Sequence, residues 1–148
     1  MDDDDGVLAW AAVLRAHAAV VSRLERELQA ERGLSLTWYD VLLSLYRGPK
    51  DGLRMNDLAE SVVLSRTRVS RVVDEMEAAG LVQRLPNPAD GRSTIVTLTP
   101  PGRTAFRRAA PVYLRGIAEH FTGLLDAGEI ACVRAALGKV VVAHAAVR

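Results

Sequence analysis

The 148-residue sequence predicts a mostly α-helical protein with a small β-hairpin. Three observations support this fold class. Apolar residues recur at helical spacing through both ends of the chain, and aromatic residues make up only 5% of it. One segment near residue 90 combines β-branched residues with turn-forming ones. The length suits one lobed domain rather than two large domains.

A helix expected over residues 65–76 has one apolar and one polar face. Four apolar residues recur at i, i+3, i+4 and i+7 and share one side of the helix: Val69, Val72, Val73 and Met76. Ser65 stands where an N-cap is expected. The polar side holds no acid before Asp74, and its first turns carry Arg66, Arg68 and Arg71. Three cations beside the positive end of a helix dipole predict a surface that binds phosphate groups.

A second short helix is expected just before this one. It covers residues 55–61, with Asn56 as its cap, and residues 62–64 form the connecting turn. Two short helices joined this closely are typical of a helix-turn-helix, whose second helix enters the DNA major groove.

A hairpin is predicted after Gly80. Residues 81–85 and 93–98 have strand composition, and the link 86–92 consists of turn-forming residues. We expect the tip to carry Asp90, Gly91 and Arg92, because a flexible guanidinium suits the narrow minor groove. Asp90 is expected to pair with Arg92 or another arginine. A simple turn with an incidental arginine is the alternative interpretation.

These segments together resemble the MarR-type winged helix-turn-helix transcription regulators. The resemblance rests on Leu58-Ala59, on residues 69–74 and 80–84, on Asp90-Gly91-Arg92, and on Leu98-Thr99 followed by Gly102. It implies a winged helix-turn-helix lobe flanked by N- and C-terminal dimerisation helices. It also implies a dimeric DNA-binding regulator that a small molecule releases from DNA.

The N-terminal part of the chain predicts two helices. Residues 7–31 carry a heptad-like seam suited to packing against another helix: Trp10, Leu14, His17, Val21, Leu24 and Leu28. Thr37 to Asp40 has the form of a capping box and opens a second helix that ends near Tyr46.

The C-terminal part also predicts helices. One begins at Pro100-Pro101 and breaks or kinks at Pro111, with an apolar face at Tyr113, Leu114, Ile117, Phe121 and Leu124. Asp126 caps a final helix that ends near His144 and turns Ile130, Val133, Leu137, Val140 and Val141 inward.

These patterns predict the domain organisation. Residues 1–6 are expected to be a disordered acidic tail, and 7–148 a single domain. Within it, 7–34 and 104–148 are the expected dimerisation helices, and 35–103 the DNA-binding lobe. The net charge of the chain is +1, and it would be +5 without the four acidic residues Asp2 to Asp5. The rest of the chain is therefore basic.

Four residues are candidates for binding a small-molecule effector: Trp10, His17, Trp38 and Tyr39. Aromatic rings at the start of the second helix could stack on a flat phenolic compound. Core packing is the alternative for each aromatic residue, and a hydrogen-bonded core histidine is the alternative for His17.

Several function classes are not expected. Cys132 is the only cysteine, and His17, His120 and His144 are far apart in sequence, so neither a disulfide, a metal nor a cofactor is predicted. The sequence shows neither a nucleophile paired with a base nor a phosphate-binding glycine loop, so an enzyme is not predicted. The acidic N-terminus and the lack of a long uncharged run favour a cytoplasmic protein without a membrane partner.

The predicted function is a homodimeric, sequence-specific repressor that binds a palindromic operator. Base contacts are expected from Thr67, Arg68, Ser70 and Arg71, and phosphate contacts from Arg66, Arg84 and Arg54. Ser65 and Asp90 belong to the same predicted DNA-binding set. Two alternative functions stay open. One is a regulator that responds to oxidation of Cys132; the other interpretation of Cys132 is a small buried hydrophobic residue that does not react. The second alternative is a winged helix that binds protein instead of DNA.

Overall fold

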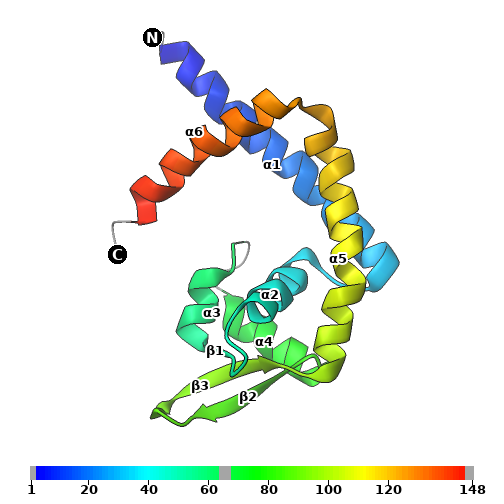
Figure 1. The fold of residues 1–148 in the computed structure, drawn as a ribbon, viewed down its shortest axis with the longest axis vertical. Helices are drawn as coiled ribbons and strands as arrows, with labels where there is room; N and C mark the ends of the chain where they lie inside the picture. The colour runs from blue at the N-terminus through cyan, green and yellow to red at the C-terminus, as the bar shows by residue number, and fades with distance from the viewer. Residues whose placement is uncertain (1–2, 64–67, 146–148) are drawn as a thin grey trace.

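The computed structural model describes residues 3–63 and 68–145. Its elements in chain order are α1 (Asp3–Arg32), α2 (Leu36–Arg47), β1 (Leu53–Arg54), α3 (Met55–Ser61), α4 (Val69–Ala78), β2 (Val82–Asn87), β3 (Asp90–Leu98), α5 (Pro100–His120), the 3₁₀ turn η2 (Thr122–Leu124) and α6 (Ala127–Ala145). The predicted mostly α-helical fold with a small β-wing is confirmed. A lobe made of α2, α3, α4 and the sheet lies at one end of α5, and α1 and α6 extend from the other end (Figure 1).

The lobe contains a three-stranded antiparallel sheet in the order β1-β3-β2. Leu53 of β1 pairs with Val96, and Val82 of β2 pairs with Leu98. Sequence analysis missed β1, because two residues are too few to show the alternation that marks a strand.

The tip of the β2–β3 hairpin is Pro88-Ala89, not the predicted Asp90 to Arg92. The Asn87 side-chain oxygen accepts a hydrogen bond from the Ala89 backbone N–H at 3.0 Å, and the Asn87 side-chain amide donates to Ser93 Oγ at 2.8 Å. These bonds close the turn early, so both strands are longer than expected.

One hydrophobic core joins the lobe to the two long helices. The apolar side of α4 is buried as predicted, through Val69, Val72, Val73 and Met76. Leu24 and Leu28 of α1 belong to the same core as Phe106, Ala109 and Val112 of α5. The helix-turn-helix therefore shares one core with α5.

Three predicted helix starts are wrong. α1 begins at Asp3 rather than Val7, so residues 3–6 are helical and not a disordered tail, since carboxylates favour a helix N-terminus. The N-cap of α2 is Ser35, whose hydroxyl accepts a hydrogen bond from the Trp38 N–H, and not Thr37. Arg54, without a side-chain cap bond, occupies the cap of α3, and Asn56 lies inside that helix.

Of the kink or break predicted at Pro111, the break is wrong, because α5 continues through this residue to His120. Proline has no backbone N–H, so the carbonyl four residues before Pro111 loses its helical hydrogen bond. Because Pro111 is on the exposed side of α5, water can bind that carbonyl instead. The predicted apolar face of α5 is only partly covered, since Leu114 and Leu124 are exposed.

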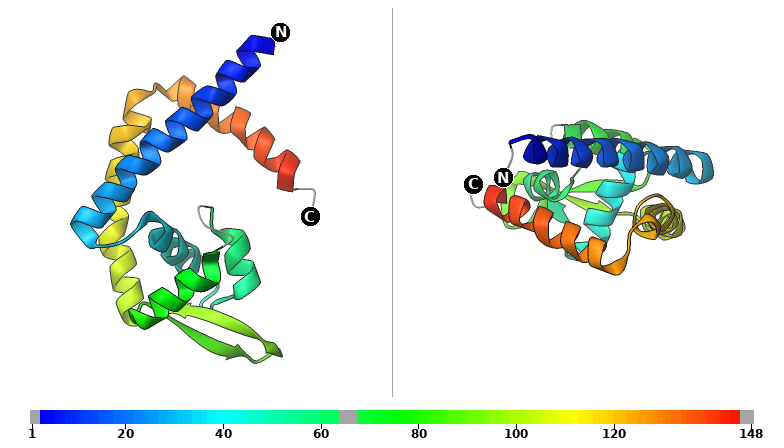
Figure 2. Two further views of the ribbon diagram at one scale, coloured as in Figure 1. Left: turned by 180° about the vertical axis from the view of Figure 1, so that it is seen from behind. Right: turned by 90° about the horizontal axis from the view of Figure 1, so that it is seen from above.

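The Asp126 cap of α6 is confirmed. Asp126 Oδ1 accepts the Glu129 N–H, and Glu129 Oε2 accepts the Asp126 N–H, both at 2.8 Å. None of the residues expected to face inward is buried within the single chain, although Ile130 and Val133 are half-buried. Seen from above, α1 and α6 form two separate arms (Figure 2).

Helix α1 is long and apolar enough over Asp4–Arg32 to cross a membrane, by length and composition alone. Most of its apolar residues before Leu24 are exposed, including Trp10 at 62%. The heptad spacing of these residues favours a second helix as their cover.

The junction between the hairpin and α5 is tightly packed. The Thr99 N–H donates to the Leu81 carbonyl at 3.1 Å, and Thr99 Oγ1 accepts the Gly102 N–H at 3.1 Å. A β-carbon at Gly102 would overlap the same Leu81 carbonyl oxygen. Only glycine fits here without moving the backbone.

Gly102→Ala is expected to lower the free energy of unfolding by about 1 to 3 kcal/mol, because the added methyl group overpacks this junction. Urea unfolding followed by circular dichroism at one fixed protein concentration measures the change. Gly91→Ala is the control, since its new methyl group would meet open space. Equal losses for the two variants would contradict the interpretation.

Candidate DNA-binding surface

The outer face of α4 carries the side chains predicted to contact DNA. Arg68, Ser70 and Arg71 are exposed, on the side opposite the buried valines and Met76. Arg71 makes an ion pair with Glu75 at 3.5 Å, and its side chain is 79% exposed. This distance and exposure make the pair weak, so Arg71 can exchange Glu75 for another acceptor. The predicted residues Ser65, Arg66 and Thr67 lie outside the described residues.

Arg84 does not lie free on the surface as a phosphate-binding residue would. Its guanidinium contacts Asp74 at 2.7 Å, Glu77 at 3.4 Å and the Ser70 carbonyl oxygen at 3.2 Å. The Arg84 backbone N–H also donates to Glu77 at 2.7 Å, and its side chain is only 24% exposed. Arg84 of β2 therefore ties the wing to α4.

The wing presents Arg92 beyond this tie. The β2–β3 hairpin extends from the sheet away from α5 (Figure 1), and Arg92 is exposed in β3. Asp90 Oδ1 accepts a hydrogen bond from the Arg92 backbone N–H at 3.0 Å, so Asp90 shapes the backbone beside the arginine. The expected partner of Asp90 is the side chain of Arg92 or another arginine; Asp90 instead bonds the Arg92 N–H. The hydrogen bond with Asp57 raises the pKa of Arg54, and the charge of Asp90 adds to this rise.

A further arginine-carboxylate pair lies at the start of α3. The Arg54 guanidinium donates to both carboxylate oxygens of Asp57, at 2.7 and 3.2 Å. The hydrogen bond raises the pKa of Arg54 and lowers that of Asp57. Arg54 is thus engaged within the protomer, like Arg84.

The geometry and the comparisons with known proteins agree. The chain is 30% identical to AbsC, a MarR family transcriptional regulator from Streptomyces coelicolor, and the two structures superpose with a TM-score of 0.87 over 100% of this chain and 98% of that one. The chain belongs to the MarR family. The MarR family model itself matches residues 32–93. The protein is therefore a DNA-binding transcriptional regulator and not an enzyme.

Two further relatives support this assignment. Sco3205, a MarR family regulator from the same organism, was crystallised with DNA; it is 27% identical, with a TM-score of 0.82 over 98% of this chain and 91% of that one. A putative transcriptional regulatory protein for the hcr operon of Thauera aromatica is 27% identical over 113 residues, 76% of this chain and 67% of its own length. The chain spans about half to two thirds of the curated relatives that it matches.

The four predicted effector residues of this MarR protein do not form one site. Trp10 and His17 are exposed on the uncovered part of α1. Tyr39 is 3% exposed and packs against Phe106 and Tyr113, with ring centroids at 5.6 and 4.5 Å. Burial raises the pKa of Tyr39 to about 12, and the nearby Tyr113 adds to this shift. Tyr39 is therefore a core residue.

Trp38 lies between two surface pockets. One, of about 360 Å³, is lined by Trp38 with residues from the ends of α1 and α4 and from α5, including Arg32, Leu81, Ala105 and Arg108. The other, of about 300 Å³, is lined by Trp38 with Arg68, Arg71 and Glu75 of α4. Trp38 thus connects a candidate effector pocket with the DNA-binding face.

Cys132 is exposed on α6, and the expectation of a small buried hydrophobe is wrong within the protomer. No residue of α6 is buried within the protomer. The sequence pattern therefore identified an apolar helix, but it did not show which surface packs against that helix.

Arg84→Ala is expected to lower the free energy of unfolding by about 1 kcal/mol, because it removes a partly buried arginine that joins β2 to α4. Chemical denaturation monitored by circular dichroism gives the value. Arg92→Ala removes the same side chain from an exposed wing position and should leave stability nearly unchanged. A loss for Arg92→Ala as large as that for Arg84→Ala would argue against the tie.

Proposed function

We propose that this MarR protein is a cytoplasmic, homodimeric repressor that binds a palindromic DNA operator and is released by a small aromatic effector. The observation that carries the proposal is the combination of an arginine-bearing outer face on α4 with two uncovered apolar arms. The first surface suits DNA, and the second suits another copy of the chain.

The dimer follows from the apolar surface of the arms. Leu24 and Leu28 at the C-terminal half of the α1 seam are covered by α5, whereas Trp10 and Leu14 at its N-terminal half are exposed. The other exposed apolar side chains of the arms are Val7, Leu8, Leu137, Val140, Val141 and Val142. A surface of this extent marks an interaction site, and a two-fold axis would let both arms bury it. We propose residues 7–34 and 104–148 as the dimerisation region and 35–103 as the DNA-binding lobe.

The DNA contacts divide between two grooves. α4 would enter the major groove, where Arg68, Ser70 and Arg71 reach base edges and arginine favours guanine O6 and N7. Arg92 would enter the adjacent minor groove, where the narrow width concentrates negative potential. The tie through Arg84 sets the distance between these two elements, which makes Arg84 a positioning residue. The two α4 helices of the dimer would read half-sites about 10 bp apart.

Arg71→Ala is expected to weaken binding to the preferred duplex by about 1 to 3 kcal/mol and to reduce discrimination between sequences. The duplex is first selected from a random pool, and affinities are then measured by fluorescence anisotropy at several salt concentrations. Arg134→Ala on α6 removes the same charge from outside the DNA-binding lobe and should change little, provided that size-exclusion chromatography shows the variant to form the same oligomer as the wild type. A duplex with one half-site should bind more weakly than the full palindrome.

Two results would oppose this division of contacts. Equal losses for Arg71→Ala on selected and random duplexes would show that Arg71 contributes only charge. Equal affinity for duplexes with one and with two half-sites would contradict binding of the operator by a dimer.

The effector would bind in the 360 Å³ pocket beside Trp38. Its indole offers a surface for stacking. Arg32 and Arg108 supply positive charge at the same pocket, whereas Glu31, which also lines it, is paired with Arg115. A phenolate or aromatic carboxylate matches this lining. Because Trp38 also lines the pocket that holds Arg68 and Arg71, a bound effector can shift α4 away from its DNA-binding position.

Small phenols and aromatic acids are expected to quench the fluorescence of Trp38 and to weaken DNA binding over the same concentration range. Trp10→Phe leaves Trp38 as the only tryptophan, so the signal reports on the surroundings of Trp38 alone. Trp38→Phe is the matched variant and should lose the quenching. An aromatic acid that releases DNA from both variants equally, without quenching Trp38, would place the effector elsewhere.

A further inference from the structure

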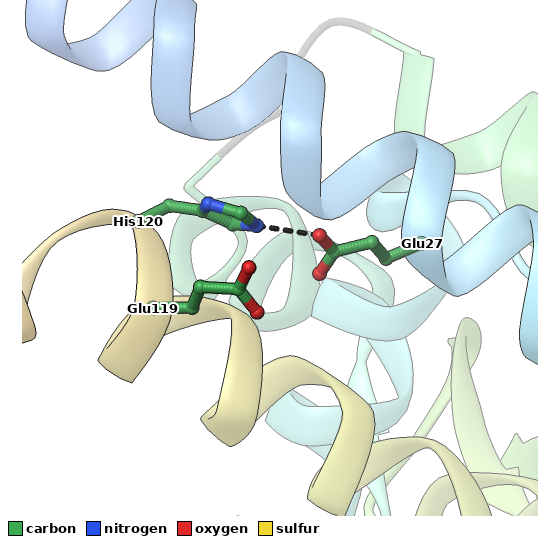
Figure 3. A group of neighbouring side chains, drawn as sticks. All are labelled: Glu27, Glu119 and His120. Atoms are coloured by element: carbon green, nitrogen blue, oxygen red, sulfur yellow. Dashed lines mark hydrogen bonds and ion pairs between the residues drawn. The ribbon is translucent and has the colours of Figure 1, made fainter.

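Three side chains that sequence analysis did not associate converge between α1 and the end of α5. His120 Nε2 lies 2.5 Å from Glu27 Oε1, although the residues are 93 positions apart in the chain. The carboxylate of Glu119 points into the same space (Figure 3). One donor atom from each of Glu27, Glu119 and His120 lies within 4.8 Å of the other two.

The cluster is electrostatically incomplete. The two carboxylates and the imidazole surround one space (Figure 3), so the cluster holds two acidic groups and one histidine. Glu27 Oε2 is fully buried and has no hydrogen-bond partner among the described residues. Arg115, on the same side of α5, is bound to Glu31. A cation at the centre of the cluster would supply the charge that Glu27 and Glu119 lack.

The packing of α1 against α5 holds the cluster in place. A β-carbon at Gly116 would approach Glu27 Oε2 to 2.9 Å and would overlap the Leu24 side chain, so glycine permits this close approach. The Glu31–Arg115 ion pair and a 2.8 Å hydrogen bond from Arg32 Nε to the Arg108 carbonyl oxygen hold the same two helices together. Glu27 and His120 are therefore presented by rigid elements, whereas the exposed Glu119 can adjust its rotamer.

We propose that Glu27, Glu119 and His120 form a binding site for a divalent transition-metal ion, for which Zn²⁺ is the best match. One imidazole nitrogen and two carboxylate oxygens are ligands that Zn²⁺ accepts at about 2.0 to 2.2 Å. Ligand atoms of a tetrahedral ion with such bonds lie roughly 3.4 Å apart. Binding would therefore replace the 2.5 Å contact between His120 and Glu27 by two bonds to the ion, and a rotation of Glu119 would supply the third ligand. Three protein ligands leave one position for water or an exchangeable ligand. Magnesium and calcium fit less well, because they favour all-oxygen sites.

The test is direct measurement of Zn²⁺ affinity by competition with a chromophoric chelator, using the full-length protein without a histidine tag. The wild-type protein is expected to bind one Zn²⁺ per protomer. Glu119→Gln keeps the Glu27–His120 contact and the exposed surface of α5, and should bind Zn²⁺ at least about tenfold more weakly. His120→Ala should lose the site. His144→Ala removes a histidine from exposed α6 and should bind like the wild type.

Two outcomes would overturn the proposal: no Zn²⁺ binding by the wild-type protein, or equal affinity of the wild type, Glu119→Gln and His120→Ala. Circular dichroism of each variant confirms that it is folded. Co²⁺ provides a second readout, because its visible absorption bands report the ligands and should change in Glu119→Gln but not in His144→Ala. The assays contain no DNA, so their result is independent of the proposed repressor function.

Discussion

The close contact between α1 and α5 is the constraint on which the arrangement of this protein depends. Leu24 and Leu28 share a core with Ala109 and Val112, and Gly116 lets the helix backbones approach. Since α5 is one continuous helix from the wing junction to η2, anything that orients its far end also orients the lobe. The arms and the DNA-binding surface are thus mechanically linked, and residues that cross this contact can influence DNA binding from a distance.

The arginines of the lobe differ in their acidic partners. Arg54 and Arg84 are each bound to nearby carboxylates, whereas Arg71 has only a weak exposed pair. The net charge of the chain conveys nothing of this distribution. A bound arginine still has a role, because Arg84 holds the wing at a defined position beside α4. The proposed contacts with two grooves would depend on that position.

Local signals in the sequence predicted much of the fold and part of the site. The buried face of α4, the hairpin, the start of α5 and the capping box at Asp126 and Glu129 each depend on residues within a few positions of one another. The errors arose where two local signals competed. Thr37 has capping-box spacing, but Ser35 precedes it and takes the cap of α2, and Pro111 is tolerated because its side of α5 faces solvent.

By itself, the sequence determined the order of the helices, the polarity of α4 and the resemblance to MarR regulators, because helical periodicity and motif spacing are properties of the linear chain. Tertiary structure alone decided that Arg84 binds Asp74 and Glu77, that Tyr39 is core while Trp38 lines two pockets, and that Glu27 meets His120. These contacts join distant residues, and their geometry depends on how whole helices pack. Periodicity shows which side of a helix is apolar, but packing decides what covers it, and the uncovered arms of α1 and α6 are the clearest example.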